Sequence, residues 1–295
     1  MIKSLINTRH ERVVIKDKNR ELKADVYIPR EFLKDEQIQK EERVGGRTGI
    51  LLLHGLGANS GEVYRMMTKG EILDHVLFVP RIDSITESKS RHMLRQASID
   101  IELFMNEAKK YCDHLFVFGH SLGGYLTTFV LQNARVKNVE GICLIGTPYS
   151  FKEVMFKLGL NLLGFVGKRI ETIKPIVKQL EKEMPELHYS SLEKKLYFHN
   201  FKFDNVDEVK DLFNAPSLLE ISTPKVPMIL IHGIDDEIIS YNHSVLLYQK
   251  LRKNNRNVEL NLIPFAGHHL KGMEKEAIEK INVWMRKIIS QYKDI

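Results

Sequence analysis

Short apolar runs alternate with helix-like segments along most of this chain of 295 residues. A short continuous apolar run is typical of a strand buried on both faces, and apolar residues three or four positions apart are typical of an amphipathic helix. Strand-like runs occupy residues 50–53, 76–79, 115–118, 139–145, 228–231 and 258–263, and helix-like segments occupy residues 60–69, 90–111, 122–133, 243–253 and 273–292. This alternation predicts an α/β fold, with a mostly parallel sheet flanked by helices.

Two parts of the chain depart from this alternation. Residues 11–16 and 21–28 have the pattern of two strands joined by a turn. Residues 148–225 carry apolar side chains at helical spacing, but they begin directly after one predicted strand and end directly before the next. This placement predicts a helical cap inserted over the edge of the sheet, with residues 1–147 and 226–295 forming the α/β core.

The composition is that of an ordinary globular protein, with 43% hydrophobic and 28% charged residues. No segment approaches the roughly 18–20 consecutive apolar residues that cross a bilayer, and the first residues lack the apolar core of a signal peptide. The 44 Lys and Arg residues are interspersed with 38 Asp and Glu residues, which indicates a solvated surface and no nucleic-acid partner. We therefore expect a cytoplasmic protein in which Cys112 and Cys143 are buried thiols.

The motif GHSLG at residues 119–123 joins a predicted strand to a predicted helix. A nucleophilic serine at such a sharp turn requires small neighbours, and Gly119 and Gly123 provide them. The N-terminus of the following helix favours developing negative charge. The motif therefore makes Ser121 the candidate catalytic nucleophile.

A serine hydroxyl is a poor nucleophile at neutral pH, so it requires a base that is itself oriented by an acid. Asp235 and Asp236 lie in the loop after one predicted strand, and His268 and His269 lie in the loop after the next. In G-x-S-x-G hydrolases the chain order is serine, then acid, then histidine, as it is here. From position alone, either aspartate and either histidine qualifies.

These motifs resemble those of α/β-hydrolase-fold serine hydrolases, and in pattern they are similar to carboxylesterases and monoacylglycerol lipases. The resemblance covers residues 48–147 and 226–295. In such enzymes the acid loop reads H-G-x-x-D-x-x-[VI], which selects Asp236 within HGIDDEII at residues 232–239. The catalytic histidine of such enzymes follows a glycine, which selects His268 over His269.

The resemblance also implies an oxyanion hole made of two backbone N–H groups. One belongs to Leu122, the residue after the nucleophile, and the other to Leu56 in the segment HGLG at residues 54–57. One feature departs from the lipase-like pattern. Many of these relatives carry a D-x-R-G-x-G-x-S loop, whereas residues 80–88 of this chain contain no glycine. We expect this wall of the site to have a different shape.

Three further histidines, His54, His120 and His232, stand at the ends of predicted strands. They lack the spacing of zinc ligands, so we interpret them as structural side chains that hydrogen-bond the loop backbone. The chain also contains no G-x-G-x-x-G motif and no P-loop. We accordingly predict neither a metal nor a cofactor.

The resemblance implies a serine hydrolase that cleaves small-molecule carboxylic esters by way of an acyl-enzyme, and the apolar character of the cap segment adds the expectation of an apolar acyl chain. The alternatives are an acyl-thioester hydrolase, an acyltransferase, or a ligand-binding homologue without catalysis. Residues 151–180 of the cap are apolar and carry six Lys and Arg residues against two Glu residues. This segment forms either a helical roof on the sheet or a lid that lines an acyl pocket and makes weak contact with membrane surfaces.

Overall fold

A computed structural model describes residues 8–30, 32, 46–56, 58, 60–72, 74–86, 93–133, 139–154, 211–212, 214–222 and 224–291. Within these residues, eight strands form one sheet in the order β1-β2-β4-β3-β5-β6-β7-β8. The strands are β1 (Thr8–Asp17), β2 (Arg20–Pro29), β3 (Thr48–Leu53), β4 (Val76–Arg81), β5 (His114–His120), β6 (Gly141–Ile145), β7 (Met228–Gly233) and β8 (Val258–Ile263).

The sheet is parallel except at one edge. Strands β1 and β2 form an antiparallel hairpin, and β2 pairs antiparallel with β4. All other neighbouring strands are parallel. The predicted α/β fold with a mostly parallel sheet is therefore confirmed.

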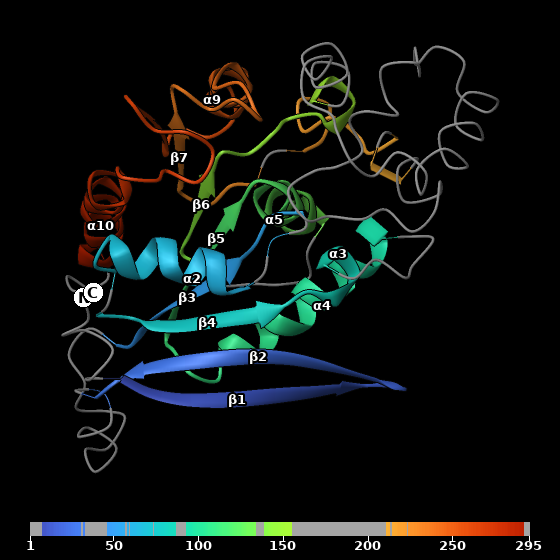
Figure 1. Cartoon of the computed structure of the whole chain (residues 1–295), viewed down its shortest axis with the longest axis vertical. Coiled ribbons are helices and arrows are strands. Elements are labelled where there is room, and N and C mark those ends of the chain that lie inside the picture. Colours follow the sequence, from blue (N-terminus) through green and yellow to red (C-terminus); the bar gives the residue numbers. More distant parts are fainter. Residues whose placement is uncertain are drawn as a thin grey trace, which may run out of the picture.

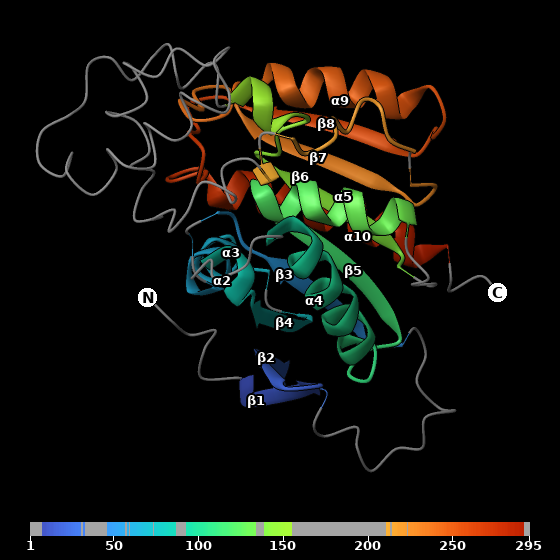
Figure 2. The ribbon, with the colours of Figure 1, turned by 90° about the vertical axis from the view of Figure 1, so that its right-hand side faces the viewer.

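Helices cover both faces of this sheet (Figure 1 and Figure 2). The helices are α2 (Ser60–Lys69), α3 (Asp83–Thr86), α4 (Met93–Ala108), α5 (Leu122–Asn133), α9 (Asn242–Arg252) and α10 (Glu274–Ser290). The four-residue helix α3 lies within residues 80–88, which we expected to be a loop. A single helical turn is too short for apolar residues to recur at helical spacing, so the sequence pattern did not predict this helix.

Strand β3 shows how the sheet divides the core into two layers. Ile50 and Leu52 belong to the apolar layer that also contains residues of α2 and α10, whereas Leu51 and Leu53 belong to the layer that contains residues of α4, α5 and α9. Successive side chains of a strand point to opposite faces, so both faces of β3 must be apolar. This arrangement accounts for the continuous apolar run of the strand.

The parallel strands bring the loops that follow them to a single edge of the sheet. The loops after β3, β5, β7 and β8 carry all the residues that the sequence predicts for the active site. This edge is where open α/β sheets place their ligands.

Most of the predicted cap lies outside the described residues. Of residues 148–225, the structure describes 148–154, 211–212, 214–222 and 224–225. The boundaries of the core and of the cap therefore remain predictions. In the described part of the chain, no helix combines the length and apolar character that crossing a membrane requires.

Candidate active site

Ser121 occupies a strained turn between β5 and α5. Its φ is 54°, in the left-handed region that residues other than glycine rarely adopt. Its N–H donates to the carbonyl of Ile145 at 2.8 Å, which ties the turn to the end of β6. A Cβ at Gly119 would lie 2.5 Å from the Gly123 carbonyl oxygen, and a Cβ at Gly123 would lie 2.4 Å from the Leu53 carbonyl oxygen. Both glycines are therefore required for this close approach.

The loop after β3 lies directly beside this turn. A Cβ at Gly55 would lie 2.9 Å from the Ser121 Cβ and 3.4 Å from its Oγ. Leu56 follows in this loop, and Leu122 is the first residue of α5. The first N–H groups of a helix have no partner within the helix, so that of Leu122 is available for another acceptor. The structure thus brings both predicted oxyanion-hole residues close to Ser121.

Asp236 and His268 are in direct contact. The Asp236 Oδ2 lies 2.7 Å from the His268 Nδ1. The Asp236 Oδ1 accepts the N–H groups of Ile238 at 2.9 Å and Ile239 at 2.7 Å. The Asp236 side chain is 0% exposed and that of His268 is 7% exposed. The loops after β7 and β8 therefore form one buried acid–imidazole pair.

The protonation of this pair follows from its contacts. Burial by itself would raise the pKa of the Asp236 carboxyl, but hydrogen bonds from His232 and His268 lower that pKa well below its ordinary range. An ionised carboxylate only accepts hydrogen bonds, so the His268 Nδ1 carries a proton. In the neutral ring, the His268 Nε2 then keeps a free lone pair and is able to act as a base.

Of the adjacent candidates on these loops, the structure pairs Asp236 with His268. Asp235 is exposed, and its N–H donates to the carbonyl of Ala266 at 3.0 Å. His269 is also exposed, and its ring stands edge-on to that of His268 at 5.2 Å. The structure therefore brings Asp236 and His268 together, and their catalytic roles stay a prediction.

His268 is also tied to the residue that precedes the nucleophile. The His120 Nε2 lies 2.9 Å from the carbonyl oxygen of His268, and the two ring centroids are 4.6 Å apart. An N–H must donate to a carbonyl, so the Nε2 of His120 is protonated. Burial, followed by the neighbouring His268 and His269, lowers the pKa of His120 well below its ordinary value. A neutral His120 therefore fixes the His268 backbone next to the Ser121 turn.

A glycine that the motifs did not reveal makes room for the pair. Gly146 follows β6 with a φ of +54°, and its N–H donates to the carbonyl of Ile231 at 2.9 Å. A Cβ at this position would lie 3.2 Å from the His268 Nδ1 and 3.5 Å from the Asp236 Oδ2. Its only sequence signal was its place at the end of a predicted strand.

The other two strand-end histidines also bond loop backbone. The His54 Nδ1 lies 2.9 Å from the Gly55 carbonyl oxygen, and the His54 Nε2 accepts the Ile82 N–H at 3.3 Å. The His232 Nε2 lies 2.8 Å from the Ile239 carbonyl oxygen. These contacts agree with the interpretation of the three histidines as structural. Within the described residues, no group of three or more His, Cys, Asp or Glu side chains is arranged to hold a metal ion.

Known structures share this architecture. Est1E from Butyrivibrio proteoclasticus superposes with a TM-score of 0.63 at 16% identity, over 95% of this chain and 99% of Est1E. The Pyrococcus furiosus esterase Pf2001 superposes with a TM-score of 0.58 at 15% identity, over 97% of this chain and 94% of that esterase. At such low identity, the likeness shows the fold alone.

Sequence comparisons extend this likeness to a family. Esterase EstD from Thermotoga maritima is 22% identical over 270 residues, which are 81% of this chain but only 62% of EstD. The chain thus spans less than two thirds of this relative. The hydrolase family described as serine aminopeptidase, S33, matches residues 91–276, which are more than half of the chain. The sheet order and this match together establish that the chain belongs to the S33 serine aminopeptidase family, on the α/β-hydrolase fold.

Proposed function

We propose that this protein is a serine hydrolase that cleaves small-molecule carboxylic esters with an apolar acyl chain. The observation that carries the proposal is the buried Asp236–His268 pair, held beside the strained Ser121 turn. A nucleophile, a base and an orienting acid are the three parts that acyl transfer through a serine requires. All three are supplied by loops at one edge of the sheet.

In this mechanism the Ser121 Oγ attacks the carbonyl carbon of the ester while the His268 Nε2 takes its proton. Asp236 holds the imidazole and stabilises the imidazolium. The N–H groups of Leu56 and Leu122 stabilise the negative charge on the former carbonyl oxygen. The C–O bond to the alcohol then breaks, and His268 returns the proton to that oxygen. Water, deprotonated by His268, hydrolyses the acyl-enzyme and restores Ser121.

The names of the relatives support an ester as the substrate. EstD and the Pyrococcus furiosus protein are both named as esterases. The description of the family, serine aminopeptidase, makes hydrolysis of a peptide amide the second candidate. A tetrahedral oxyanion forms in both reactions, so Ser121, Asp236 and His268 serve either substrate.

The acyl preference is proposed from the cap sequence. Residues 151–180 are rich in Phe, Leu, Val and Met, and most of them lie outside the described residues. An apolar cap over the sheet edge favours acyl groups longer than acetyl. If this face also meets lipid, anionic vesicles bind the protein and salt weakens that binding. Co-sedimentation with such vesicles at low and high salt tests this part of the proposal.

A substrate screen tests the proposed reaction. It compares p-nitrophenyl esters of graded chain length with an acyl-CoA thioester and an aminoacyl p-nitroanilide. We expect turnover of the esters, with a kcat/KM that rises beyond acetyl. Faster hydrolysis of the anilide would replace the proposal with an aminopeptidase, and faster hydrolysis of the thioester would replace it with a thioesterase. If no substrate is hydrolysed and a fluorophosphonate does not label Ser121, the protein is a binding homologue without catalysis.

A further inference from the structure

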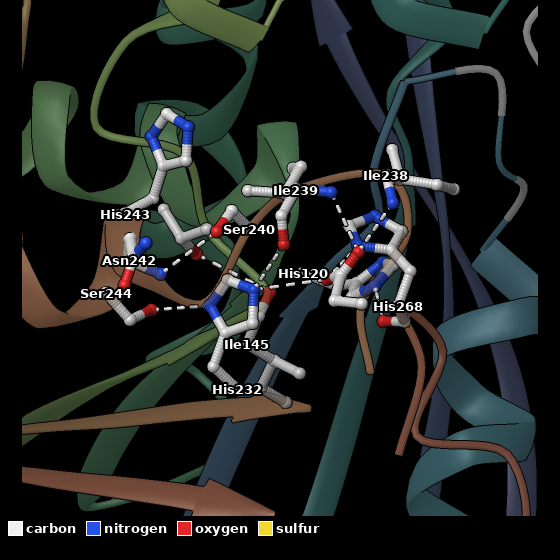
Figure 3. Close-up of polar contacts among 12 residues, drawn as sticks. His120, Ile145, His232, Ile238, Ile239, Ser240, Asn242, His243, Ser244 and His268 are labelled. Carbon is white, nitrogen blue, oxygen red and sulfur yellow. Dashed lines mark hydrogen bonds and ion pairs between the residues drawn. The ribbon is translucent and has the colours of Figure 1, made fainter. Parts of the chain in front are cut away.

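The Asp236 carboxylate contacts a second imidazole besides that of His268. The His232 Nε2 lies 3.1 Å from the same Oδ2 atom that His268 contacts at 2.7 Å. His232 is the fifth residue of β7, and Asp236 lies four residues later, where the loop turns back toward the strand end. Both side chains are 0% exposed. The His232 Nε2 also reaches the Ile239 carbonyl oxygen at 2.8 Å (Figure 3), so this ring contacts the loop backbone as well as the carboxylate.

The partners of His232 fix the position of its proton. Its Nε2 faces two groups that only accept hydrogen bonds, the Ile239 carbonyl and the Asp236 carboxylate. The Nε2 therefore carries the proton and shares it between these two acceptors. In the neutral ring the Nδ1 is an acceptor, and the Ser244 hydroxyl, 2.6 Å away, donates to it. Ser244 lies in the first turn of α9, so this helix selects the tautomer of His232.

The second imidazole completes the hydrogen bonding of the carboxylate. The Oδ1 accepts two backbone N–H groups, from Ile238 and Ile239, and the Oδ2 faces the N–H groups of His268 and His232. Four donors around one carboxylate leave it no other orientation of comparable energy. The hydrogen bond from His232 also reduces the negative charge that the Oδ2 presents to His268.

We propose that His232 is a positioning residue that holds the Asp236 carboxylate against His268, with Ser244 fixing the proton of His232 on Nε2. The proposal rests on the function proposed above, because the role of Asp236 in orienting His268 belongs to that function. It extends the hydrogen-bonded chain from the Ser121 turn through His268, Asp236 and His232 into α9. His232 acts through Asp236 and does not touch the reacting atoms.

A purely structural role for His232 makes different predictions. If His232 only closes the loop through Ile239, its loss reduces the fraction of folded, active enzyme and leaves each remaining site unchanged. If His232 positions Asp236, its loss changes every site, because the Oδ2 then presents more negative charge to the His268 ring and stabilises the imidazolium. The acid limb of the kcat/KM profile therefore moves to higher pH. Within the described residues, the other titratable groups packed around His268 are His120 and His269, and they are unaltered in this comparison.

The experiment uses three variants and one matched control of the full chain. His232→Leu removes the donor at similar volume, His232→Gln restores an N–H near the position of Nε2, and Ser244→Ala removes only the hydroxyl that fixes the tautomer. Ser98→Ala is the control, because Ser98 also lies on a helix, but its hydroxyl donates to the Leu94 carbonyl of that same helix, α4, at 2.8 Å. The number of active sites is titrated with a fluorophosphonate in each preparation, and thermal unfolding reports folding.

For His232→Leu, we expect kcat per titrated site to fall about ten- to a hundredfold, as expected for losing a hydrogen bond to a charged group, with KM unchanged. The acid limb moves to higher pH. His232→Gln recovers most of kcat, Ser244→Ala shows a smaller loss, and Ser98→Ala matches the wild type. If His232→Leu does not fold, Ser244→Ala and Ser244→Thr provide the same test. We then expect kcat per titrated site to fall in Ser244→Ala and to return toward the wild-type value in Ser244→Thr, which keeps the hydroxyl. An unchanged kcat per site, or an unmoved acid limb, overturns the proposal.

A second readout separates this proposal from the proposed function. The proton that the His268 Nδ1 donates to a carboxylate gives a far-downfield NMR resonance, and observing it requires no substrate. We expect this resonance to move further downfield in His232→Leu, since the remaining hydrogen bond strengthens, and to stay in place in Ser98→Ala. A wild type without turnover or labelling overturns the proposed function. A resonance that does not move in His232→Leu overturns the role of His232.

Discussion

The ring of His120 donates its Nε2–H to the backbone carbonyl of His268, 148 residues later in the chain, at 2.9 Å. His120 immediately precedes Ser121, and it is 3% exposed. This buried hydrogen bond joins the turn that carries Ser121 to the loop that carries His268, and it restricts the movement of one relative to the other. The relative position of the Ser121 turn and the His268 loop is therefore fixed at the end of β5, before any substrate is present.

The two adjacent aspartates give the first prediction. Asp236→Asn keeps the volume of the side chain, but it removes the charge that holds His268, so we expect kcat to fall by about 10⁴-fold, as when the triad acid of a serine protease is amidated. Asp235→Asn changes an exposed side chain, so its kcat should stay within about threefold of the wild type. The measurement is kcat of the two variants at matched thermal stability. A larger loss of kcat for Asp235→Asn would show that the assignment of Asp236 as the partner of His268 in catalysis is wrong.

Gly55 gives a second prediction, because it lies against the nucleophile. A Cβ at this position would lie 2.9 Å from the Ser121 Cβ, so Gly55→Ala must displace either the turn or the loop that carries Leu56. We expect kcat to fall by about a hundredfold or more, as for loss of one oxyanion-hole donor. The control is Gly267→Ala, whose Cβ would meet, among the described residues, only the Asp235 carbonyl oxygen, at 3.8 Å. Equal activity of the two variants would contradict the placement of this loop.

His75, between α2 and β4, predicts how stability depends on pH. Burial, opposed by Asp74 and reinforced by Arg286, lowers the pKa of His75 from 6.5 to about 4. The Nδ1 of His75 is buried without a hydrogen-bond partner within the described structure. The unfolded chain thus binds a proton between these pH values that the folded chain does not. Proton binding to His75 therefore has no effect on the free energy of unfolding above about pH 6.5, and it lowers that free energy as the pH falls toward 4.

The corresponding measurement is the free energy of unfolding at several pH values. The wild type should lose at most about 3 kcal/mol from this group between pH 6.5 and pH 4. His75→Phe keeps a ring that does not titrate, and its stability should fall less over the same interval. Parallel stability curves for the two proteins would show that His75 is not the group responsible.

Much of the fold followed from the period of the apolar residues. The run at residues 50–53 lies within β3, and that at residues 115–118 lies within β5. Strands with both faces buried are apolar throughout, so their runs are unambiguous. The predicted strand ends were less accurate. Polar residues such as Thr48 and His114 pair with each other in the sheet, but they do not extend the apolar run from which the strand was predicted.

The site was predictable only in part, for geometric reasons. The choice between Asp235 and Asp236 required a family motif, because sequence spacing does not reveal which side chain a loop turns inward. The contact of His232 with Asp236 depends on a loop that folds back on its own strand, and this has no periodic signature. The left-handed φ of Gly146 has no signature either.

The measurement that tests the central claim most directly is labelling by a fluorophosphonate together with ester hydrolysis, in the wild type and in Ser121→Ala. Ser98→Ala serves as a matched serine control. We predict that the wild type and the control are labelled at one serine, Ser121, and hydrolyse the ester. Ser121→Ala should fold normally, remain unlabelled and lose about 10⁴- to 10⁶-fold in kcat. Retained hydrolysis in a clean Ser121→Ala preparation would contradict the account.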